Sequence, residues 1–141
     1  MIVKQVSVYI ENQTGQLAKL LGILEENGID LNAATIAETV DFGIFRCIVQ
    51  NPEETVEILK ANNYTASLAK VIAVSIENRP GGLKAVLKEL EAENIAVNYI
   101  YSTIQSAGGE AVIMMKVSDI DKAIEVLKAG GVKMWCLEDL K

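Results

Sequence analysis

Two hydrophobic periods alternate along the chain, and together they predict alternating strands and helices. Branched residues occupy every second position near the N-terminus, at Val6, Val8 and Ile10. Leucine then recurs every three or four positions, at Leu17, Leu20, Leu21 and Leu24. The first spacing is typical of a strand with one buried face and the second of an amphipathic helix, which Gly28 ends. The chain therefore opens with a strand, a turn and a helix.

The rest of the chain continues in the same way and completes two similar series of elements. The first series continues with a strand over 31–39, a tight turn near 40–41, a strand over 43–49, a helix beginning at 51–54 and a strand over 64–68. The second has a strand over 71–76, a helix over 83–93, a strand over 97–105, a turn over 106–109, a strand over 111–117, a helix over 119–129 and a strand over 132–137. Each series is βαββαβ, the order of a ferredoxin-like α+β fold.

An internal repeat supports the division into two domains. Residues 10–17 read IENQTGQL, and residues 76–83, 66 positions later, read IENRPGGL. A repeat of this period indicates one compact unit that has been copied. We therefore predict tandem domains over 1–69 and 70–141, divided only by Ala69-Lys70. A unit of about 70 residues is marginal alone, so we expect the two copies to pack as a pseudo-symmetric pair.

Charge and hydropathy exclude several classes of partner. Lys and Arg number 13 against 19 Asp and Glu, which gives a net charge of -6 without long blocks of one sign. This balance argues against nucleic acid or an anionic membrane as the main partner. No apolar run approaches the roughly eighteen residues that cross a bilayer, and the first residues carry no signal-peptide pattern. We expect a soluble, cytoplasmic protein.

The side chains that usually carry catalysis or hold metals are scarce. The chain has no histidine, which removes the usual general base and the usual zinc ligand. Cys47 and Cys136 stand apart without CxxC spacing, so we interpret both as buried structural thiols. Glu25, Glu26 and Glu91 fall on the polar sides of predicted helices. We predict no catalytic residue, no metal, no cofactor and no enzymatic activity.

A βαββαβ unit hosts many functions, so the fold alone does not identify the function. We therefore compare the residues of the hairpin strand and of the first turn with those that each function requires. An RNA-binding module would carry aromatic residues in a basic surround on the strand after the hairpin. Those positions instead carry Phe45, Cys47 and Val49 in one copy and Ala111, Ile113 and Met115 in the other, without a surrounding cluster of basic residues. A metal chaperone would need paired cysteines in the first turn. That turn instead has the pattern Asn-x-x-Gly-x-Leu in both copies.

The second turn, ENRPGGL over 77–83, and the later Asn94-Ile95 resemble the characteristic motif of the ACT domain. This small-molecule-binding regulatory module of amino-acid metabolism occurs in D-phosphoglycerate dehydrogenase, aspartate kinase and the acetolactate synthase regulatory subunit. The resemblance covers nearly the whole chain. The first copy departs from the motif, because Thr14 replaces the usual proline and Gln16 a small residue.

The resemblance implies an amino-acid site where two ACT domains meet. In the family, the first turn and helix start of one domain and the second strand of another hold the ligand. Residue by residue, this implies ligand contacts at two turns, namely Asn12, Gln13, Thr14, Gly15, Gln16 and Leu17 and then Asn78, Arg79, Pro80, Gly81, Gly82 and Leu83. It also implies contacts at the starts of the second strands, namely Asp30, Leu31 and Asn32 and then Ala96, Val97 and Asn98.

The chemistry of the turns suits an amino acid. Backbone N–H groups at a helix start attract a carboxylate, glycine lets a ligand approach the backbone, and an Asn amide can both donate and accept. The alternative is that Asn12 and Asn78 cap the helices and the glycines only turn the chain. Arg79 could bind a ligand carboxylate with a forked pair of hydrogen bonds, or it could be solvated.

A second apolar face predicts assembly. If Leu31 and Val97 face the helices, then Asn32 and Asn98 face away from them. The face without helices then carries Ala34, Ile36, Ile44, Ile48, Ile100, Val112 and Met114. Sheets with two apolar faces are covered on both sides. We therefore expect this face to pack on another sheet, from the partner repeat or from a second chain, and the protein to be at least a homodimer.

The hypothesis from sequence is a non-catalytic sensor that binds a small amino acid and regulates a metabolic enzyme or other partner in trans. One alternative is a structural dimerisation module without a ligand. A less favoured alternative is a small enzyme that uses the cleft between the repeats.

Overall fold

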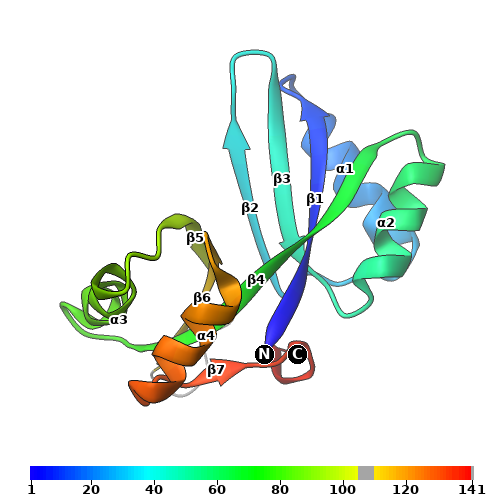
Figure 1. Cartoon of the computed structure of the whole chain (residues 1–141). Coiled ribbons are helices and arrows are strands. Elements are labelled where there is room, and N and C mark those ends of the chain that lie inside the picture. Colours follow the sequence, from blue (N-terminus) through cyan, green and yellow to red (C-terminus); the bar gives the residue numbers. More distant parts are fainter. Residues whose placement is uncertain (105–109, 141) are drawn as a thin grey trace. The chain divides into compact units, whose positions relative to one another are not determined.

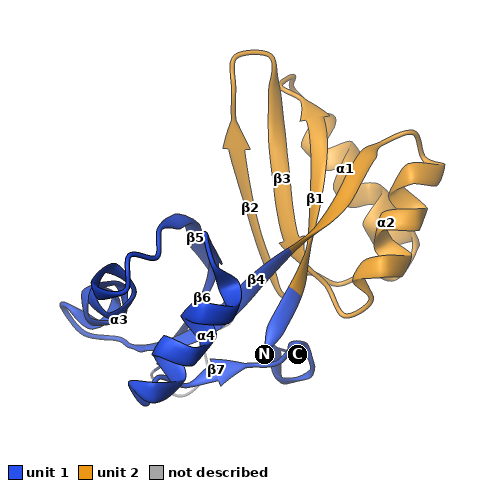
Figure 2. Cartoon of the chain, viewed as in Figure 1, with its two compact units in different colours: residues 1–3, 70–141 blue, residues 4–69 orange. Residues whose placement is uncertain are grey.

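The computed structural model describes residues 1–104 and 110–140. The chain divides into two compact units (Figure 2). The N-terminal unit, orange in Figure 2, is Lys4–Ala69, and the C-terminal unit, blue, is Met1–Val3 with Lys70–Lys141. The division between them therefore falls inside the first strand and again near the middle of the sequence.

The N-terminal unit is an antiparallel sheet with two helices on one face (Figure 1). Its elements are β1 (Ile2–Glu11), α1 (Gln16–Glu26), β2 (Ala33–Glu38), β3 (Phe42–Ile48), α2 (Pro52–Ala61) and the start of β4 (Thr65–Glu77). The strand order is β2-β3-β1-β4. Pro52 at the start of α2 and Glu53 and Glu54 in its first turn are residues that favour a helix N-terminus.

The C-terminal unit repeats this arrangement. It contains the remainder of β4, followed by α3 (Gly82–Ala92), β5 (Val97–Ser102), β6 (Glu110–Val117), α4 (Ile120–Ala129), β7 (Met134–Trp135) and a 3-10 helix (Leu137–Leu140). Its strands have the order β5-β6-β4, and β7 pairs with β4. The predicted α+β fold of two βαββαβ units is thus confirmed.

Two predicted element boundaries are wrong. The two units do divide between Ala69 and Lys70, but the expected break between two strands is absent there, because β4 continues as one strand from Thr65 to Glu77. No glycine or proline lies between these residues to interrupt it. The last strand is shorter than predicted, since the Cys136 N–H donates to the Asp139 carboxylate at 3.1 Å and the chain turns into the 3-10 helix. The turn predicted over 106–109 lies outside the described residues.

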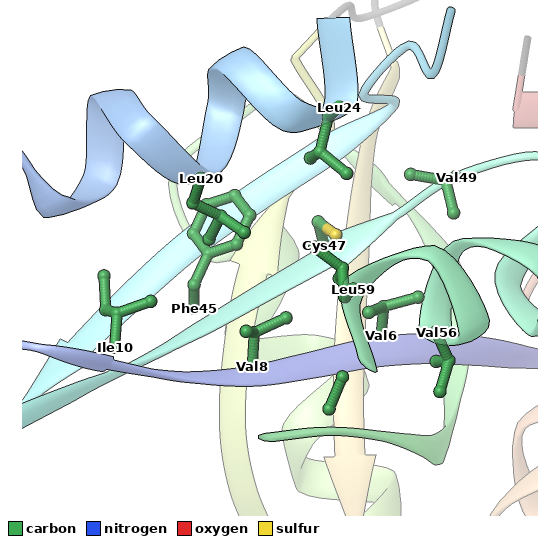
Figure 3. Close-up of a cluster of buried hydrophobic side chains, with 11 residues drawn as sticks. Val6, Val8, Ile10, Leu20, Leu24, Phe45, Cys47, Val49, Val56 and Leu59 are labelled. Atoms are coloured by element: carbon green, nitrogen blue, oxygen red, sulfur yellow. The ribbon is translucent and has the colours of Figure 1, made fainter. Parts of the chain in front are cut away.

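Each unit has its own hydrophobic core between helices and sheet. In the N-terminal unit, Leu20 and Leu24 of α1 and Leu59 of α2 point toward Val8 and Phe45 of the sheet (Figure 3). The C-terminal core has the same plan, with Leu90 of α3 and Leu127 of α4 against the sheet. Burial of each such leucine contributes about 1.5 to 3 kcal/mol. The helical leucine spacing therefore predicted the core correctly.

Near the start of the second strand of each unit, the alternation of side chains between the two faces of the sheet slips by one residue. This slip corrects three predicted positions. Leu31 and Ala34 both pack on the N-terminal core although they are three residues apart. In the C-terminal unit, the register shifts between Val97 and Tyr99, which makes Asn98 the extra residue of a β-bulge.

The slip turns the residues after it to the other face. Ala34, Ile36 and Ile100 pair with Cys47, Phe45 and Met115, which belong to the two cores. Directly paired residues share a face of an antiparallel sheet, so these three lie on the side of the helices, contrary to the prediction. Ile44 and Val112 pair with Tyr9 and Ser75 and do lie on the other face.

Candidate functional site

Glycine sets the geometry of both candidate turns. Gly15 and Gly81 are the residues that precede α1 and α3, and both have left-handed backbone angles, with φ of 88° and 86°. Residues with a Cβ rarely adopt this conformation, so the backbone requires the glycine of the Asn-x-x-Gly pattern. The two helices consequently leave their turns with nearly the same geometry.

The starts of these helices carry no side-chain cap in the part of the chain that the structure describes. The alternative in which Asn12 caps α1 is therefore wrong. The Asn12 side chain donates instead to the Thr39 carbonyl at 3.4 Å, and its backbone N–H donates to the Asp41 carbonyl at 3.3 Å. Asn12 thus ties the turn to the β2–β3 hairpin. Uncapped N–H groups at the helix start keep their partial positive charge for an anion.

The C-terminal turn is the tighter of the two. A Cβ at Gly82 would lie 2.1 Å from the Glu77 carbonyl oxygen, so the buried Gly82 cannot carry a side chain without a backbone shift. The N-terminal unit has Gln16, half-buried, at the equivalent position. The two turns therefore differ in backbone packing just beyond the glycine that they share.

Arg79 is paired within its own turn. Its Nε donates to the Glu77 carboxylate, and its Nη1 donates to the Pro80 carbonyl at 3.3 Å. Both charged side chains are more than half exposed, so water and salt weaken their attraction. The cation that sequence reasoning assigned to a ligand or to solvent is held at the turn by Glu77.

The predicted turn residues and the predicted second-strand residues of the N-terminal unit do not lie together. Residues 12–15 and 78–81 are exposed at the turns, and Leu17 and Leu83 are half-buried beside them. The first turn lies at the Phe42 end of the sheet, because Glu11 pairs with Phe42. The start of the second strand lies at the far end of β3, because the Asn32 N–H donates to the Ile48 carbonyl. Seven residues of β3 separate these ends by about 20 Å.

Hydrogen bonds fix the starts of the second strands locally. The Leu31 N–H donates to the Asp30 carboxylate at 3.0 Å, and the Gln50 side chain donates to the Asn32 side-chain oxygen at 3.1 Å. In the C-terminal unit, the Ala96 N–H donates to the Ser118 hydroxyl at 3.0 Å. Val97 is half-buried, and Asn98 is exposed at the bulge.

Sequence reasoning missed Gln50 and Ser118, which hold these strand starts. Each follows a buried strand, with Ile48-Val49 before Gln50 and Val117 before Ser118. A polar residue directly after the end of a predicted strand was the signal that could have identified them. Thr39 and Asp41, which bind Asn12, gave no comparable signal because polar residues are ordinary in a hairpin.

The two cysteine thiols differ in their exposure to solvent. Burial raises the pKa of Cys47 to about 12, so this thiol stays protonated and is a poor nucleophile at neutral pH. Cys136 is exposed, which corrects the prediction that both are buried. It lies just after β7, because that strand ends at Trp135.

Neither a metal centre nor a membrane span emerges from residues 1–104 and 110–140. No three His, Cys, Asp or Glu side chains in these ranges are grouped so that they could hold a metal ion. Likewise, none of the helices in these ranges is both long and apolar enough to cross a membrane.

The paired units and their glycine turns define a tandem ACT-domain regulatory fold. The family described as ACT domain pair matches residues 1–140, and the chain belongs to this family. The resemblance seen in the two turns is thereby confirmed.

Solved structures agree with this assignment. The crystal structure of protein BT0572 from Bacteroides thetaiotaomicron is 37% identical, with a TM-score of 0.92 over 99% of this chain and 96% of that chain. The ligand-free regulatory subunit of aspartate kinase from Thermus thermophilus is 16% identical, with a TM-score of 0.66 over 92% of this chain and 96% of that one. The subunit from Thermus flavus is 14% identical, with a TM-score of 0.63 over 92% of each chain. No curated protein matches the chain.

Proposed function

We propose that the protein is a non-catalytic sensor that binds a small amino acid and regulates a metabolic enzyme in trans. The observation that carries the proposal is the pair of uncapped helix starts, each preceded by a left-handed glycine in an ACT domain. An amino acid presents a carboxylate, which suits backbone N–H groups at a helix start. The Thermus relatives, named as regulatory subunits of aspartate kinase, make an enzyme the natural kind of partner.

The site proposed here needs two ACT domains. A turn alone offers donors for the carboxylate but no enclosure, and a ligand left half in water gains little beyond the cost of its immobilisation. Within one unit, Asn12 and Asn32 lie at opposite ends of the sheet, so a single unit does not enclose the ligand with both groups. The second wall of the proposed site is therefore the second-strand start of a neighbouring ACT domain, in a protein that is at least a homodimer.

We assign this regulation to the cytoplasm. Enzymes of amino-acid metabolism are the proposed partners, and a reducing compartment is compatible with the free thiols of Cys47 and Cys136.

A thermal-shift panel of the twenty amino acids tests the proposal. A ligand present at about a hundred times its dissociation constant stabilises the folded state by about 2.7 kcal/mol, which raises the melting temperature of a protein this size by roughly 5 to 10 °C. We expect such a rise with at least one amino acid. The matched control is the amide of the same amino acid, which lacks the carboxylate and should give a much smaller rise.

Melting that is unchanged by every amino acid at millimolar concentration would contradict the sensor and favour a structural dimerisation module. An equal rise with the acid and its amide would show that the carboxylate does not bind at a helix start.

A further inference from the structure

Two exposed aromatic rings lie on the helix-free face of the N-terminal unit. Tyr9 of β1 and Phe42 of β3 have ring centroids 5.6 Å apart and are 48% and 40% exposed. Tyr9 alternates with Val8 and Ile10, which belong to the core, and Phe42 lies on the same face as Tyr9 because it pairs with Glu11. Both rings therefore point away from the helices. The whole chain has only 7 aromatic residues: 2 Phe, 4 Tyr and 1 Trp. Two of these few aromatic side chains therefore lie exposed on one face of a sheet.

The repeat provides an internal comparison, because the C-terminal unit has a polar pair at the same position. Tyr9 pairs with Ile44 and is diagonal to Phe42, which pairs with Glu11. In the same register, Ser75 pairs with Val112 and is diagonal to Glu110, which pairs with Glu77. The Ser75 hydroxyl donates to the Glu110 carboxylate at 2.8 Å. One site of the repeat thus accommodates either kind of pair.

The polar pair is what a sheet face in water ordinarily carries, and the aromatic pair is what an interface carries. Tyrosine and phenylalanine are enriched at protein interfaces, where their large rings bury much area with little loss of side-chain entropy. Since the Ser75–Glu110 pair is compatible with the fold, folding of the unit does not require Tyr9 and Phe42 at the equivalent positions. These residues therefore serve another purpose.

Charges on the same face are arranged so that the face can bind itself. Glu11 lies beyond Tyr9 at one end, and Arg46, which pairs with Ser7, lies beyond Ile44 at the other. Consider a two-fold axis that lies between two such faces and runs perpendicular to the strands at the Tyr9–Ile44 pair. This axis would set Arg46 of each copy against the Glu11 end of the other. Such self-complementarity is what an isologous homodimer requires.

We propose that this aromatic face, made of Tyr9, Glu11, Phe42, Ile44 and Arg46, binds the same face of a second copy of the chain. Two sheets packed in this way lie about 10 Å apart and bury the exposed rings between them. The inference rests on the homodimer of the proposed function but not on amino-acid binding.

The test transplants the polar pair of one unit into the other. In the full chain, Tyr9→Ser with Phe42→Glu gives the N-terminal unit the pair that the C-terminal unit already has. Light scattering with dilution should show a wild-type dimer and a double variant whose dimer dissociation constant is about 100-fold higher. The matched control is Val40→Ser, which removes an apolar side chain that is 93% exposed outside this face. This control should leave the dimer unchanged.

A charge swap tests the two-fold arrangement. Arg46→Glu and Glu11→Arg should each weaken the dimer about tenfold, and the combined variant should recover most of the affinity. Additive losses would show that the copies do not meet in this orientation and would overturn the interface as described.

Amino-acid thermal shifts measured on the same samples separate this proposal from the sensor. A monomeric wild-type protein, or a dimer unaffected by the Tyr9 and Phe42 changes, would overturn the interface whatever the amino-acid result. A dimer that dissociates in the double variant supports the interface even if no amino acid shifts the melting temperature.

Discussion

The two glycine turns share a backbone and differ in the side chains around it. Both precede their helices with a left-handed glycine, Gly15 or Gly81, and neither helix receives a side-chain cap. The N-terminal turn presents uncharged Gln13 and Thr14, whereas the C-terminal turn carries an Arg79–Glu77 ion pair beside Pro80. The glycine therefore fixes where the helix N–H groups point, and the neighbouring positions decide what else a ligand meets.

The largest difference between the turns should appear on adding one methyl group. Gly82→Ala places a Cβ against the Glu77 carbonyl oxygen, at 2.1 Å in the present geometry, and should destabilise the C-terminal unit by about 3 kcal/mol. The chain's single tryptophan, Trp135, reports unfolding of this unit by fluorescence. Gln16→Ala at the equivalent position should change stability by no more than about 0.5 kcal/mol. Equal losses in urea denaturation would show that the two turns pack alike.

The next effect concerns the shared glycines. Gly81→Val and Gly15→Val each force a branched side chain into a left-handed backbone, which costs about 1 to 3 kcal/mol, and should abolish the amino-acid shift at the altered turn. Gly22→Ala is the control, since it lies inside α1 with open space around it and should be neutral or slightly stabilising.

Calorimetry on the folded variants decides which turn binds. If Gly81→Val binds an amino acid as tightly as the parent, the C-terminal turn is not a site, and Gly15→Val applies the same criterion to the N-terminal turn.

A smaller effect should follow from Arg79. Arg79→Gln breaks an ion pair whose side chains are 57% and 72% exposed, so the free energy of unfolding should fall by less than about 1 kcal/mol. The loss should shrink further at high salt, because salt screens exposed charges. Gln13→Arg, the reciprocal change, gives the N-terminal turn the same cation near Glu11. A large, salt-independent loss for Arg79→Gln would mean that the guanidinium supports the turn by packing.

The smallest effect belongs to an ion pair of the N-terminal unit. Lys4 donates to Glu53 at 2.5 Å, and this hydrogen bond is the main cause that lowers the pKa of Glu53 below 4.5. A lowered folded-state pKa stabilises the protein above pH 4.5, and this contribution is lost as pH falls through the folded pKa. Lys4→Met should therefore lower the melting temperature slightly at pH 7, and the difference should vanish in acid. A difference that grows in acid would contradict the pairing.

Sequence patterns predicted the element order and the cores because strand and helix periods are set by backbone geometry. They failed where one residue changes that period. The slip at Asn32 and Asn98 reversed the faces of Ala34, Ile36 and Ile100, and alternation alone carries no signal for a bulge. The glycine turns were found from their repetition. The contact between Gly82 and Glu77 depends on backbone approach, which a sequence motif does not encode.

The unbroken course of β4 has a practical consequence. Proteases and inserted domains favour exposed, flexible segments, and a strand that runs from Thr65 to Glu77 offers none where the two units join. A reporter protein spliced in at Ala69-Lys70 would disrupt the strand that both units share. An engineered biosensor should instead carry its fluorescent protein at the exposed turn of Gly28 or Gly131, where there is open space around the backbone.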